Sequence, residues 1–328
     1  MKTAVVILNW NTREYLQKFL PKLVGSVSGM DAEVVVADNA STDGSLDLVK
    51  EQFPQVSRIS LDRNYGFTGG YNRALEQIEA EYYVLINSDI EVTDGWLGPL
   101  EQWMDTHPQC GACGPKLLSY YQRDRFEYAG AAGGLMDRWG YTYCRGRIMS
   151  RTARDNGQYD SPASVMWVTG ACMMVRSALW KKLGGLDDRF FAHMEEIDFC
   201  WRLQLEGYKV QVVPQSVVYH LGGGTLPQNS PWKLKLNYRN NLLMLDNNLA
   251  LTKGRTRAAA VIRWRLFLDR CSQSVYWIKG QKDYVKAVKE AHKEFRSMRK
   301  PDDGRSGRSH VDGMSGKIIF IEFLKRNI

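Results

Sequence analysis

The sequence predicts an α/β protein with a mainly parallel, Rossmann-like sheet flanked by helices, followed by an α-helical extension at the C-terminus. Three short apolar runs, at residues 4–8, 33–37 and 82–86, have the length and composition of strands buried on both faces. Helical patterns lie between these runs. Strands that alternate with helices indicate a doubly wound sheet whose neighbouring strands run parallel. From about residue 251 the pattern changes to basic amphipathic helices.

The helices between the expected strands are predicted from capping residues and apolar faces. Thr12 can cap the first helix, and Ser41 can cap the second, which reaches Phe53 before Pro54. Helix positions three and four residues apart share one face, so apolar residues at that spacing mark the side that packs on the sheet. These positions are Tyr15, Leu16, Phe19, Leu20 and Leu23 in the first helix and Tyr71, Ala74, Leu75 and Ile78 in the third.

Composition divides the chain of 328 residues into three expected parts. Residues 1–250 form the α/β domain, residues 251–300 a basic amphipathic helical extension, and residues 301–328 a flexible linker with a short apolar tail. The net charge of +8 is uneven, because residues 251–300 contain 14 Lys and Arg against 4 Asp and Glu. Residues 1–250 contain 25 basic and 28 acidic residues, so the basic character belongs to the extension.

The beginning of the chain does not resemble a signal peptide. The apolar run at residues 4–8 is interrupted by Asn9, and no later stretch approaches the roughly 20 apolar residues of a membrane-spanning helix. The six cysteines show no disulfide framework, and the pair Cys110 and Cys113 lacks the further ligands of a zinc site. We therefore expect a cytoplasmic protein without structural zinc.

Polar side chains follow each of the three expected strands at the point where the strand ends. In doubly wound sheets ligands bind beyond the carboxyl ends of the strands, so these residues are candidates for a binding site. Asn and Asp also form turns and cap helices, which would explain each group alone. Three polar endings that meet at one edge of the sheet favour a site. They are Asn9 and Asn11 after the first strand, Asp38 and Asn39 after the second, and Asn87, Ser88 and Asp89 after the third.

Further short motifs follow: a glycine-rich turn at residues 64–72, Thr169-Gly170-Ala171 in an apolar segment, an acidic cluster at residues 195–198, and His220 before a glycine run. In this order the motifs resemble the family 2 glycosyltransferases with the GT-A fold, especially the bacterial rhamnosyltransferase-like branch, over roughly residues 3–245. The motifs are Val6-Ile7-Leu8-Asn9-Trp10-Asn11, Asp38-Asn39-Ala40-Ser41-Thr42-Asp43-Gly44, Asn64-Tyr65-Gly66-Phe67-Thr68-Gly69-Gly70-Tyr71-Asn72, Asn87-Ser88-Asp89, Gly170-Ala171, Glu195-Glu196-Ile197-Asp198-Phe199-Cys200-Trp201-Arg202, His220 and Tyr238-Arg239-Asn240.

The resemblance implies an inverting glycosyltransferase that takes a sugar from a UDP- or dTDP-linked donor. Departure of the nucleotide diphosphate builds negative charge that a divalent cation neutralises, so Mg²⁺ or Mn²⁺ is the implied cofactor. Asp89 matches the metal-ligating last position of the family's DxD-type motif. His220 matches a metal-coordinating histidine, although a lone histidine is more often structural. Asn87 stands at the first position in place of Asp, so we assign it to the donor.

The resemblance also implies how the donor is recognised. Asp38 matches a position whose carboxylate accepts a hydrogen bond from the imide of a pyrimidine base, which indicates uracil or thymine. Glycines in the turn can bring the backbone close to the donor, although glycine is common in turns that bind nothing. The expected donor-binding residues are Asn9, Asn11, Asp38, Asn39, Asn64, Gly66, Phe67, Gly70, Asn72, Asn87 and Ser88.

The acceptor hydroxyl has a pKa far above 7, so its attack on the anomeric carbon needs a general base. Glu196 matches the base of the family's Glu-Asp motif, with Glu in place of the usual Asp, and Glu195 is the second candidate. Asp198 joins them as a catalytic candidate that orients the base, pairs with Arg202, or has no catalytic role. A tryptophan on the acceptor side can stack on a sugar, although it also suits a core. The expected acceptor-binding residues are Trp167, Thr169, Gly170 and Ala171.

The basic extension lies outside the resemblance. Its Lys and Arg residues are interleaved with Trp, Tyr and Leu, a composition that suits an amphipathic helix on an anionic membrane surface, where lipid-linked saccharides are found. A solvated helix face packed on the main domain is the alternative. We therefore expect peripheral contact of residues 251–300 with the inner face of the cell membrane, and a glycan or lipid-linked acceptor in surface polysaccharide synthesis.

Two other functions suit parts of the sequence. A noncatalytic nucleotide-binding scaffold of a polysaccharide assembly complex would keep the fold without the reaction. The net positive charge suggests nucleic-acid binding, but that charge is confined to the extension and no recognition motif accompanies it, so we expect no nucleic-acid partner. The sequence leaves open the transferred sugar, the choice between UDP and dTDP, the acceptor and linkage, and the oligomeric state.

Overall fold

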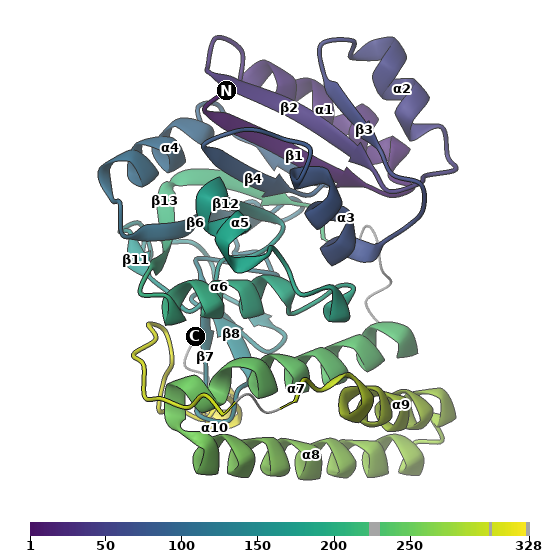
Figure 1. Cartoon of the computed structure of the whole chain (residues 1–328), viewed down its shortest axis with the longest axis vertical. Helices are drawn as coiled ribbons and strands as arrows, with labels where there is room; N and C mark the ends of the chain where they lie inside the picture. Colours follow the sequence, from purple (N-terminus) through teal and green to yellow (C-terminus); the bar gives the residue numbers. More distant parts are fainter. Residues whose placement is uncertain (223–229, 302–303, 326–328) are drawn as a thin grey trace.

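The computed structural model describes residues 1–222, 230–301 and 304–325, and its nine-stranded central sheet confirms the expected α/β fold (Figure 1). β4, β1, β2 and β3 are parallel, and β13 is parallel to β6, whereas β12 runs antiparallel to both of its neighbours. The three strands expected from the sequence are the parallel neighbours β4, β1 and β2. In sheet order the strands are β11 (Ala163–Ser164), β13 (Lys209–His220), β6 (Cys110–Ser119), β12 (Cys172–Arg176), β4 (Tyr82–Ile86), β1 (Thr3–Asn9), β2 (Ala32–Asp38) and β3 (Ser57–Ser60), and β5 (Ile90–Val92) pairs with β13.

Helices cover both faces of the sheet because successive strand residues point to opposite sides. On β1, Val5 and Ile7 belong to one core, whereas Ala4 and Val6 belong to the other. Each core is therefore closed by a different set of helices. These are α1 (Arg13–Ser26), α2 (Ser45–Gln52) and α4 (Leu97–Thr106) on the first side, and α3 (Gly66–Leu75), α5 (Ser177–Leu183) and α6 (Glu195–Leu205) on the second.

The two expected helix caps are not formed. Thr12 stands at the N-cap position of α1, but its hydroxyl donates a hydrogen bond to the Asn9 side chain. The first turn of α2 begins at Ser45, whose backbone N–H donates to Asp43. The prediction that Ser41 caps α2 was therefore wrong. The Ser41 hydroxyl instead accepts a hydrogen bond from the backbone of the loop after β1. The two loops lie side by side because β1 and β2 are neighbours in the sheet.

The segment of the chain that connects β6 to β12 forms a second, smaller sheet, which was not predicted from the sequence. Its strands are two or three residues long, too short to show a periodic apolar pattern. All of its strand pairs are antiparallel. The strands are β7 (Gly134–Met136), β8 (Thr142–Cys144), β9 (Arg147–Ile148) and β10 (Arg151–Thr152).

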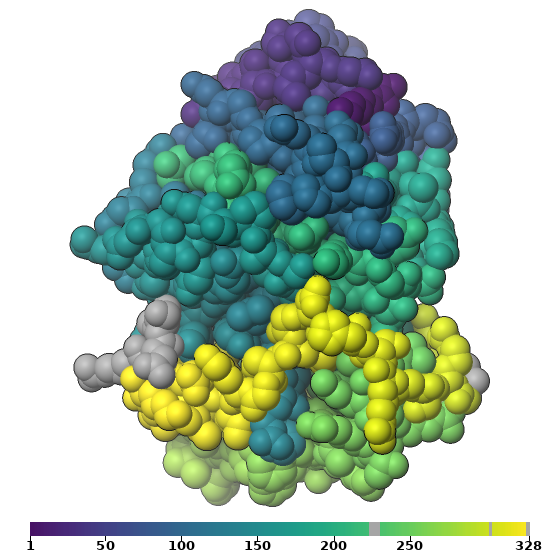
Figure 2. Space-filling model, turned by 90° about the vertical axis from the view of Figure 1, so that its left-hand side faces the viewer, coloured from purple at the N-terminus to yellow at the C-terminus, as the bar shows by residue number. Residues whose placement is uncertain are grey.

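The C-terminal helices form a layer below the sheet in Figure 1, where α7 contacts α6, α8 and α9. The chain after α9, coloured yellow in Figure 2, crosses this layer. Its Gly307 donates a backbone hydrogen bond to the Ala250 carbonyl. Whether the chain divides at residues 250 and 300 into separate units stays a prediction. Within the described residues, no helix has the length and apolar character needed to cross a membrane. The helices are α7 (Pro231–Lys253), α8 (Arg255–Ile278), α9 (Lys282–Met298) and α10 (Ile319–Leu324).

Candidate functional site

The ends of β1 and β2 place two of the expected donor residues opposite each other. Asn9 is the register partner of Asp38, and its Nδ2 donates to Asp38 Oδ1 at 2.8 Å. The other carboxylate oxygen, Oδ2, accepts from the backbone of Ser41 at 2.9 Å. Asn11 adopts a left-handed φ of 53° and accepts a hydrogen bond from Thr42 N–H at 2.8 Å. Asp38 is therefore held in one orientation by the loop around it.

Asn39 fixes the glycine-rich turn against the end of β2. Its Nδ2 donates to Asn64 Oδ1 and to the carbonyl of Gly66, both at 3.0 Å, and its Oδ1 accepts from the backbone of Tyr65. Gly66 has a φ of +71°, and a Cβ there would lie 2.5 Å from the Phe191 ring. A side chain at this position would therefore push the turn away from the loop that contains Phe191.

Gly70 lies one helical turn further along α3, and a Cβ there would lie 2.6 Å from the Leu8 side chain. Asn72, expected to contact the donor, faces another way. Its Nδ2 donates to the Leu186 carbonyl and to Asp188 Oδ1, both at 2.8 Å, and its Oδ1 accepts from Leu186 N–H. The side chain of Asn72 thus ties α3 to the segment before α6.

Asp89 and His220 come together because β5 pairs with the end of β13. The Asp89 Oδ1 lies 3.2 Å from His220 Nε2, and Glu127 Oε2 lies 3.4 Å from the other ring nitrogen, Nδ1. All three side chains are buried. Glu127 was not identified from the sequence, because it belongs to a segment without periodicity or a motif.

The charges of this cluster compensate one another. Burial raises the pKa of Asp89, but its hydrogen bond and ion pair with His220 outweigh that effect and lower the pKa below its usual value. Burial lowers the pKa of His220, whereas contact with Asp89 and Glu127 raises it to about 10. With a pKa of about 10 the imidazole is cationic at neutral pH, so His220 would have to lose a proton in order to bind a divalent cation through Nε2.

The donor set of this cluster suits a cation that is only partly ligated by protein. Among the residues that the structure describes, no group of three or more His, Cys, Asp or Glu side chains forms a metal site. Asp89 offers one carboxylate oxygen and His220 one imidazole nitrogen. Mn²⁺ accepts both kinds of ligand, whereas Mg²⁺ prefers the oxygen. Further ligands would come from a diphosphate and water, as in nucleotide-dependent Mg²⁺ sites.

The loop before β12 connects the strand ends to the acidic cluster. The backbone N–H of Asn87 donates to the Ala171 carbonyl at 2.9 Å, next to the buried Ser88. A Cβ on Gly170 would lie 3.2 Å from the Phe67 ring and 3.5 Å from the Cβ of Glu196. The structure therefore brings together the turn of α3, this loop and the start of α6.

Two of the expected acceptor residues are turned toward the protein. Thr169 is buried, and its hydroxyl accepts from the backbone of Ala171 at 3.2 Å. Trp167 is 4% exposed, and a Cβ on Gly134 would lie 1.9 Å from its indole. The indole Nε1 donates to the Leu135 carbonyl. Trp167 therefore packs in the core and presents no open ring face to a sugar.

The acidic residues at the start of α6 have different surroundings. Glu195 is 4% exposed and Glu196 is partly exposed, but the Oε2 atom of each is buried and lacks a hydrogen-bond partner within the described chain. Burial raises the pKa of Glu196 to about 7. Burial and the neighbouring Glu196 raise the pKa of Glu195 well above its usual value. The more accessible Glu196 is therefore the better placed of the two to meet a substrate.

Asp198 is fully buried and serves the contact between α6 and α7. Its Oδ2 accepts from Arg202 Nε at 2.8 Å, and its Oδ1 accepts from the amides of Asn247 and Asn248. The pair with Arg202 was one of the three alternatives drawn from the sequence. With these partners, Asp198 has no free oxygen directed at the site.

A strained loop precedes α6, between the 3₁₀ turn Asp188–Phe190 and Glu195. Phe191, His193 and Met194 have φ values of 65°, 71° and 73°, which are unfavourable for residues with a side chain. Such strain persists only where surrounding contacts impose it. The position of the acidic cluster therefore depends on what holds this loop.

Residues of α7 hold the strained loop through its carbonyl groups. The Asn240 amide donates to the carbonyls of Phe190, Ala192 and His193 at 2.9, 2.7 and 2.7 Å. Arg239 donates to the same Phe190 carbonyl at 2.8 Å and pairs with Glu294 of α9 at 2.8 Å. The motif Tyr238-Arg239-Asn240 was noted in the sequence, but its role was not predicted.

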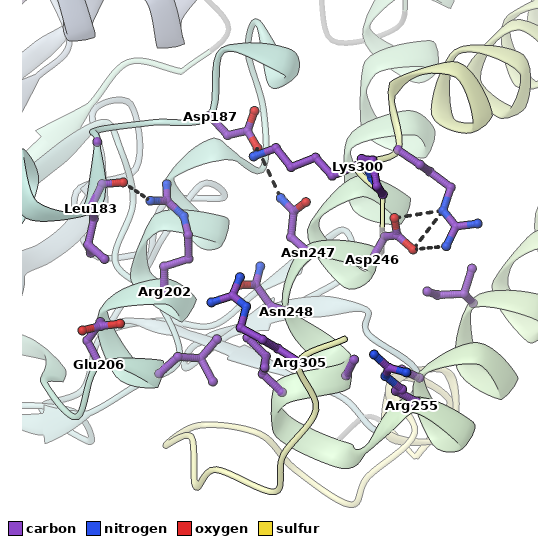
Figure 3. Close-up of a pocket in the computed structure, with 18 of the residues that line it drawn as sticks. Leu183, Asp187, Arg202, Glu206, Asp246, Asn247, Asn248, Arg255, Lys300 and Arg305 are labelled. Atoms are coloured by element: carbon purple, nitrogen blue, oxygen red, sulfur yellow. Dashed lines mark hydrogen bonds and ion pairs between the residues drawn. The ribbon is translucent and has the colours of Figure 1, made fainter. Parts of the chain in front are cut away.

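Figure 3 shows a cavity of about 630 Å³ between the α5 and α6 side of the protein and helices α7 and α8. Its lining contains none of the strand-end residues described above. Two acidic groups on its wall already pair with cations, Asp187 with Lys300 and Asp246 with Arg299. We therefore place the candidate site at the strand ends and not in this cavity.

Comparison with known proteins agrees with the motifs. The model of the family "Glycosyl transferase family 2" matches residues 4–184. A curated relative from Mycobacterium tuberculosis, named N-acetylglucosaminyl-diphospho-decaprenol L-rhamnosyltransferase, is 26% identical over 231 residues, which cover 66% of this chain and 75% of the relative.

Solved structures with the same fold show much lower sequence identity. Staphylococcus aureus TarS 1–349 in complex with UDP-GlcNAc has a TM-score of 0.57 at 16% identity, over 90% of this chain and 82% of that one. GalNAc-T7 with UDP, GalNAc and Mn²⁺ has a TM-score of 0.59 at 16% identity over 77% of this chain. The match spans 48% of the GalNAc-T7 chain, about half its length. At such identities the likeness shows the fold.

Proposed function

The chain belongs to glycosyl transferase family 2, and on this premise we propose that it is an inverting, metal-dependent glycosyltransferase with a UDP- or dTDP-linked sugar as donor. The observation that carries the proposal is that three kinds of side chain lie at the same end of the central strands. Asp38, the pair of Asp89 and His220, and Glu196 all lie at or beside the ends of the central strands. Each suits one step of such a transfer.

The pyrimidine base of the donor binds at Asp38 in this proposal. Both oxygens of the Asp38 carboxylate already accept a hydrogen bond, from Asn9 and Ser41, but each oxygen has a second lone pair. The imide N–H of uracil or thymine can donate to that lone pair. Because the carboxylate is already held in place, binding requires little further ordering of the side chain.

Asp89 and His220 would hold the divalent cation, which would neutralise charge on the departing diphosphate. The structure of GalNAc-T7 with UDP, GalNAc and Mn²⁺ supports a metal in this fold, with Mg²⁺ as the other candidate. Asn87 and Ser88 lie beside Asp89 and face the diphosphate in the proposal. Glu127, on the far side of His220, orients the imidazole.

Glu196 is the proposed general base. Its carboxylate takes the proton from the acceptor hydroxyl while the hydroxyl oxygen attacks the anomeric carbon, on the face opposite the diphosphate. Gly170 lies next to Glu196 and, with the adjacent Ala171, is the proposed acceptor contact, whereas Phe67, which packs against the same glycine, remains a proposed donor contact. The name of the Mycobacterium tuberculosis relative supports a lipid-linked sugar as acceptor. With such an acceptor the enzyme would act at the inner face of the cell membrane, in surface polysaccharide synthesis.

Calorimetric titration of UDP and dTDP, each with and without Mn²⁺, tests the donor site. We expect one of the two nucleotides to bind, and Mn²⁺ to tighten that binding by at least about tenfold, because a cation held by Asp89 and His220 would offset the charge of the diphosphate. Asp89→Asn should lose this gain. Asp94→Asn, which removes an exposed carboxylate just after β5, is the matched control and should keep it.

Two results would argue against the proposal. If neither nucleotide binds under any condition, the transferase assignment fails at its first step. If a nucleotide binds but no transfer to a lipid-linked glycan is found for any UDP- or dTDP-sugar, the noncatalytic scaffold becomes the better description.

The rate of transfer should depend on pH through Glu196. Because burial raises the pKa of Glu196 to about 7, the base is protonated and inactive below that pH and active above it. We expect kcat to fall about tenfold per unit below pH 7 and to level off above it. An unperturbed glutamate, with a pKa of about 4.3, would give a flat profile from about pH 5.5 upward. A kcat profile measured at saturating metal and constant ionic strength distinguishes the two.

A further inference from the structure

The outer side of α8 carries a continuous apolar stripe. Trp264, Phe267, Val275 and Ile278 are 40%, 52%, 48% and 76% exposed, and the exposed Cys271 lies between them. Their spacing of three and four residues puts all five on one side of the helix. The other side of α8 contains the buried residues that pack on the protein. Figure 1 shows α8 as the outermost helix at its end of the molecule.

Aromatic contacts connect this stripe to α10. Trp264 lies against Trp139, with ring centroids 5.7 Å apart, and Tyr141, two residues further along the same turn, contacts Phe320 at 5.1 Å. On α10, Phe320, Ile321 and Leu324 are 43%, 43% and 79% exposed. We name the exposed residues Trp264, Phe267, Cys271, Val275, Ile278, Phe320, Ile321 and Leu324 the apolar stripe.

Cations without exposed acids flank the stripe along α8. Arg257, Arg263 and Arg270 are exposed on this helix, and Lys279 is exposed directly after it. The one acidic residue of α8, Asp269, is 4% exposed and contacts His292 at 3.1 Å. The stripe on α8 is therefore bordered by positive charge on one side, where Arg263 and Arg270 lie, and at its two ends, where Arg257 and Lys279 lie.

We propose that the apolar stripe docks on an anionic phospholipid bilayer. Exposed Trp and Phe beside Arg and Lys suit the boundary between headgroups and acyl chains, where the rings are buried and the cations meet phosphate. Pairing of the stripe with a second copy of itself would bring Arg263 and Arg270 of both copies together, so like charges oppose that arrangement. Docking rests on the proposed function only in that a lipid-linked acceptor requires an enzyme at the bilayer.

Co-sedimentation with vesicles tests docking without any assay of transfer. The full chain should pellet with vesicles of phosphatidylcholine and phosphatidylglycerol, and much less with phosphatidylcholine alone. The double variant Phe267→Ser with Ile278→Ser should lower the partition constant by at least about tenfold, because two large apolar side chains no longer enter the bilayer. Tyr121→Ser, which removes an exposed aromatic side chain outside the stripe, is the matched control and should bind as the parent protein does.

The second pair of variants separates charge from apolar contact. Arg263→Gln with Arg270→Gln should lower binding to the anionic vesicles at low salt and leave the weak binding to phosphatidylcholine unchanged. All variants alter exposed side chains, and thermal melting checks that each remains folded.

Docking is overturned if the parent protein does not pellet with anionic vesicles, or if the stripe variants pellet as well as the parent. It is also overturned if light scattering shows a dimer that the stripe variants dissociate, since the stripe would then be an interface between copies. Nucleotide binding and transfer to a short, water-soluble acceptor analogue report on the proposed function separately. Both should be unchanged in the stripe variants.

Discussion

Replacing Glu196 with Gln is expected to lower kcat by roughly 10²- to 10⁴-fold, the range found when a general base is removed. The amide keeps the shape of the side chain but cannot take the proton of the acceptor hydroxyl. The affinity for the nucleotide should stay the same, because Asp38 and Asp89 lie on other elements. Steady-state transfer from the sugar nucleotide identified by calorimetry measures the first effect, and nucleotide titration the second.

Glu195→Gln is the matched comparison, because Glu195 is the adjacent carboxylate at the start of the same helix. Its raised pKa keeps Glu195 protonated to higher pH than an ordinary glutamate, so the neutral amide should change kcat by less than about tenfold. A larger loss for Glu195→Gln than for Glu196→Gln would exchange the roles of the two residues. Full activity of Glu196→Gln in the cell would instead favour the noncatalytic scaffold.

Asn240→Ala should lower kcat by about 100-fold and leave the KM for the sugar nucleotide nearly unchanged. The substitution removes the donor that three carbonyls of the strained loop share, so the loop relaxes and Glu196 loses its position. A shift of about 1 Å at a catalytic group is enough for a loss of this size. Unpaired buried carbonyls should also lower the free energy of unfolding by about 1–3 kcal/mol.

The neighbouring Asn241 provides the control for that variant. Asn241 is buried in the same helix and donates to one carbonyl, that of Gly140, outside the loop. Asn241→Ala should therefore lower stability by a similar amount but leave kcat within a few fold of the parent. If both variants lose kcat equally, the effect of Asn240 is general destabilisation and the loop is not held in the way we describe.

Much of the fold could be read from short stretches of sequence. The three apolar runs are β1, β2 and β4, and the residues at their ends converge as parallel pairing requires. The family resemblance led to Asp89 and His220, which the structure places in contact. These features depend on strand periodicity and on residue order, so a single sequence records them.

Other parts depend on contacts between residues far apart in the chain. Asn72 faces Leu186, 114 residues away, and this partner decides that its side chain supports the loop before α6. The indole of Trp167 packs against Gly134, which belongs to the small second sheet. The strands of that sheet are too short to leave a periodic apolar pattern in the sequence. Ser41 does not cap α2, because the backbone of the neighbouring loop after β1 donates a hydrogen bond to the Ser41 hydroxyl.

The sequence alone determined the fold class, the strand ends and the candidate acids, because strand burial, helix periodicity and motif order are properties of neighbouring residues. Only the tertiary structure decided which carboxylate is more accessible, that Glu127 joins the histidine, and that Asn240 holds the strained loop before α6. Each of these depends on burial or on a hydrogen bond across elements. The physical reason is that the pKa of an acid and the strain of a loop are set by the atoms packed around them, and those atoms come from distant parts of the chain.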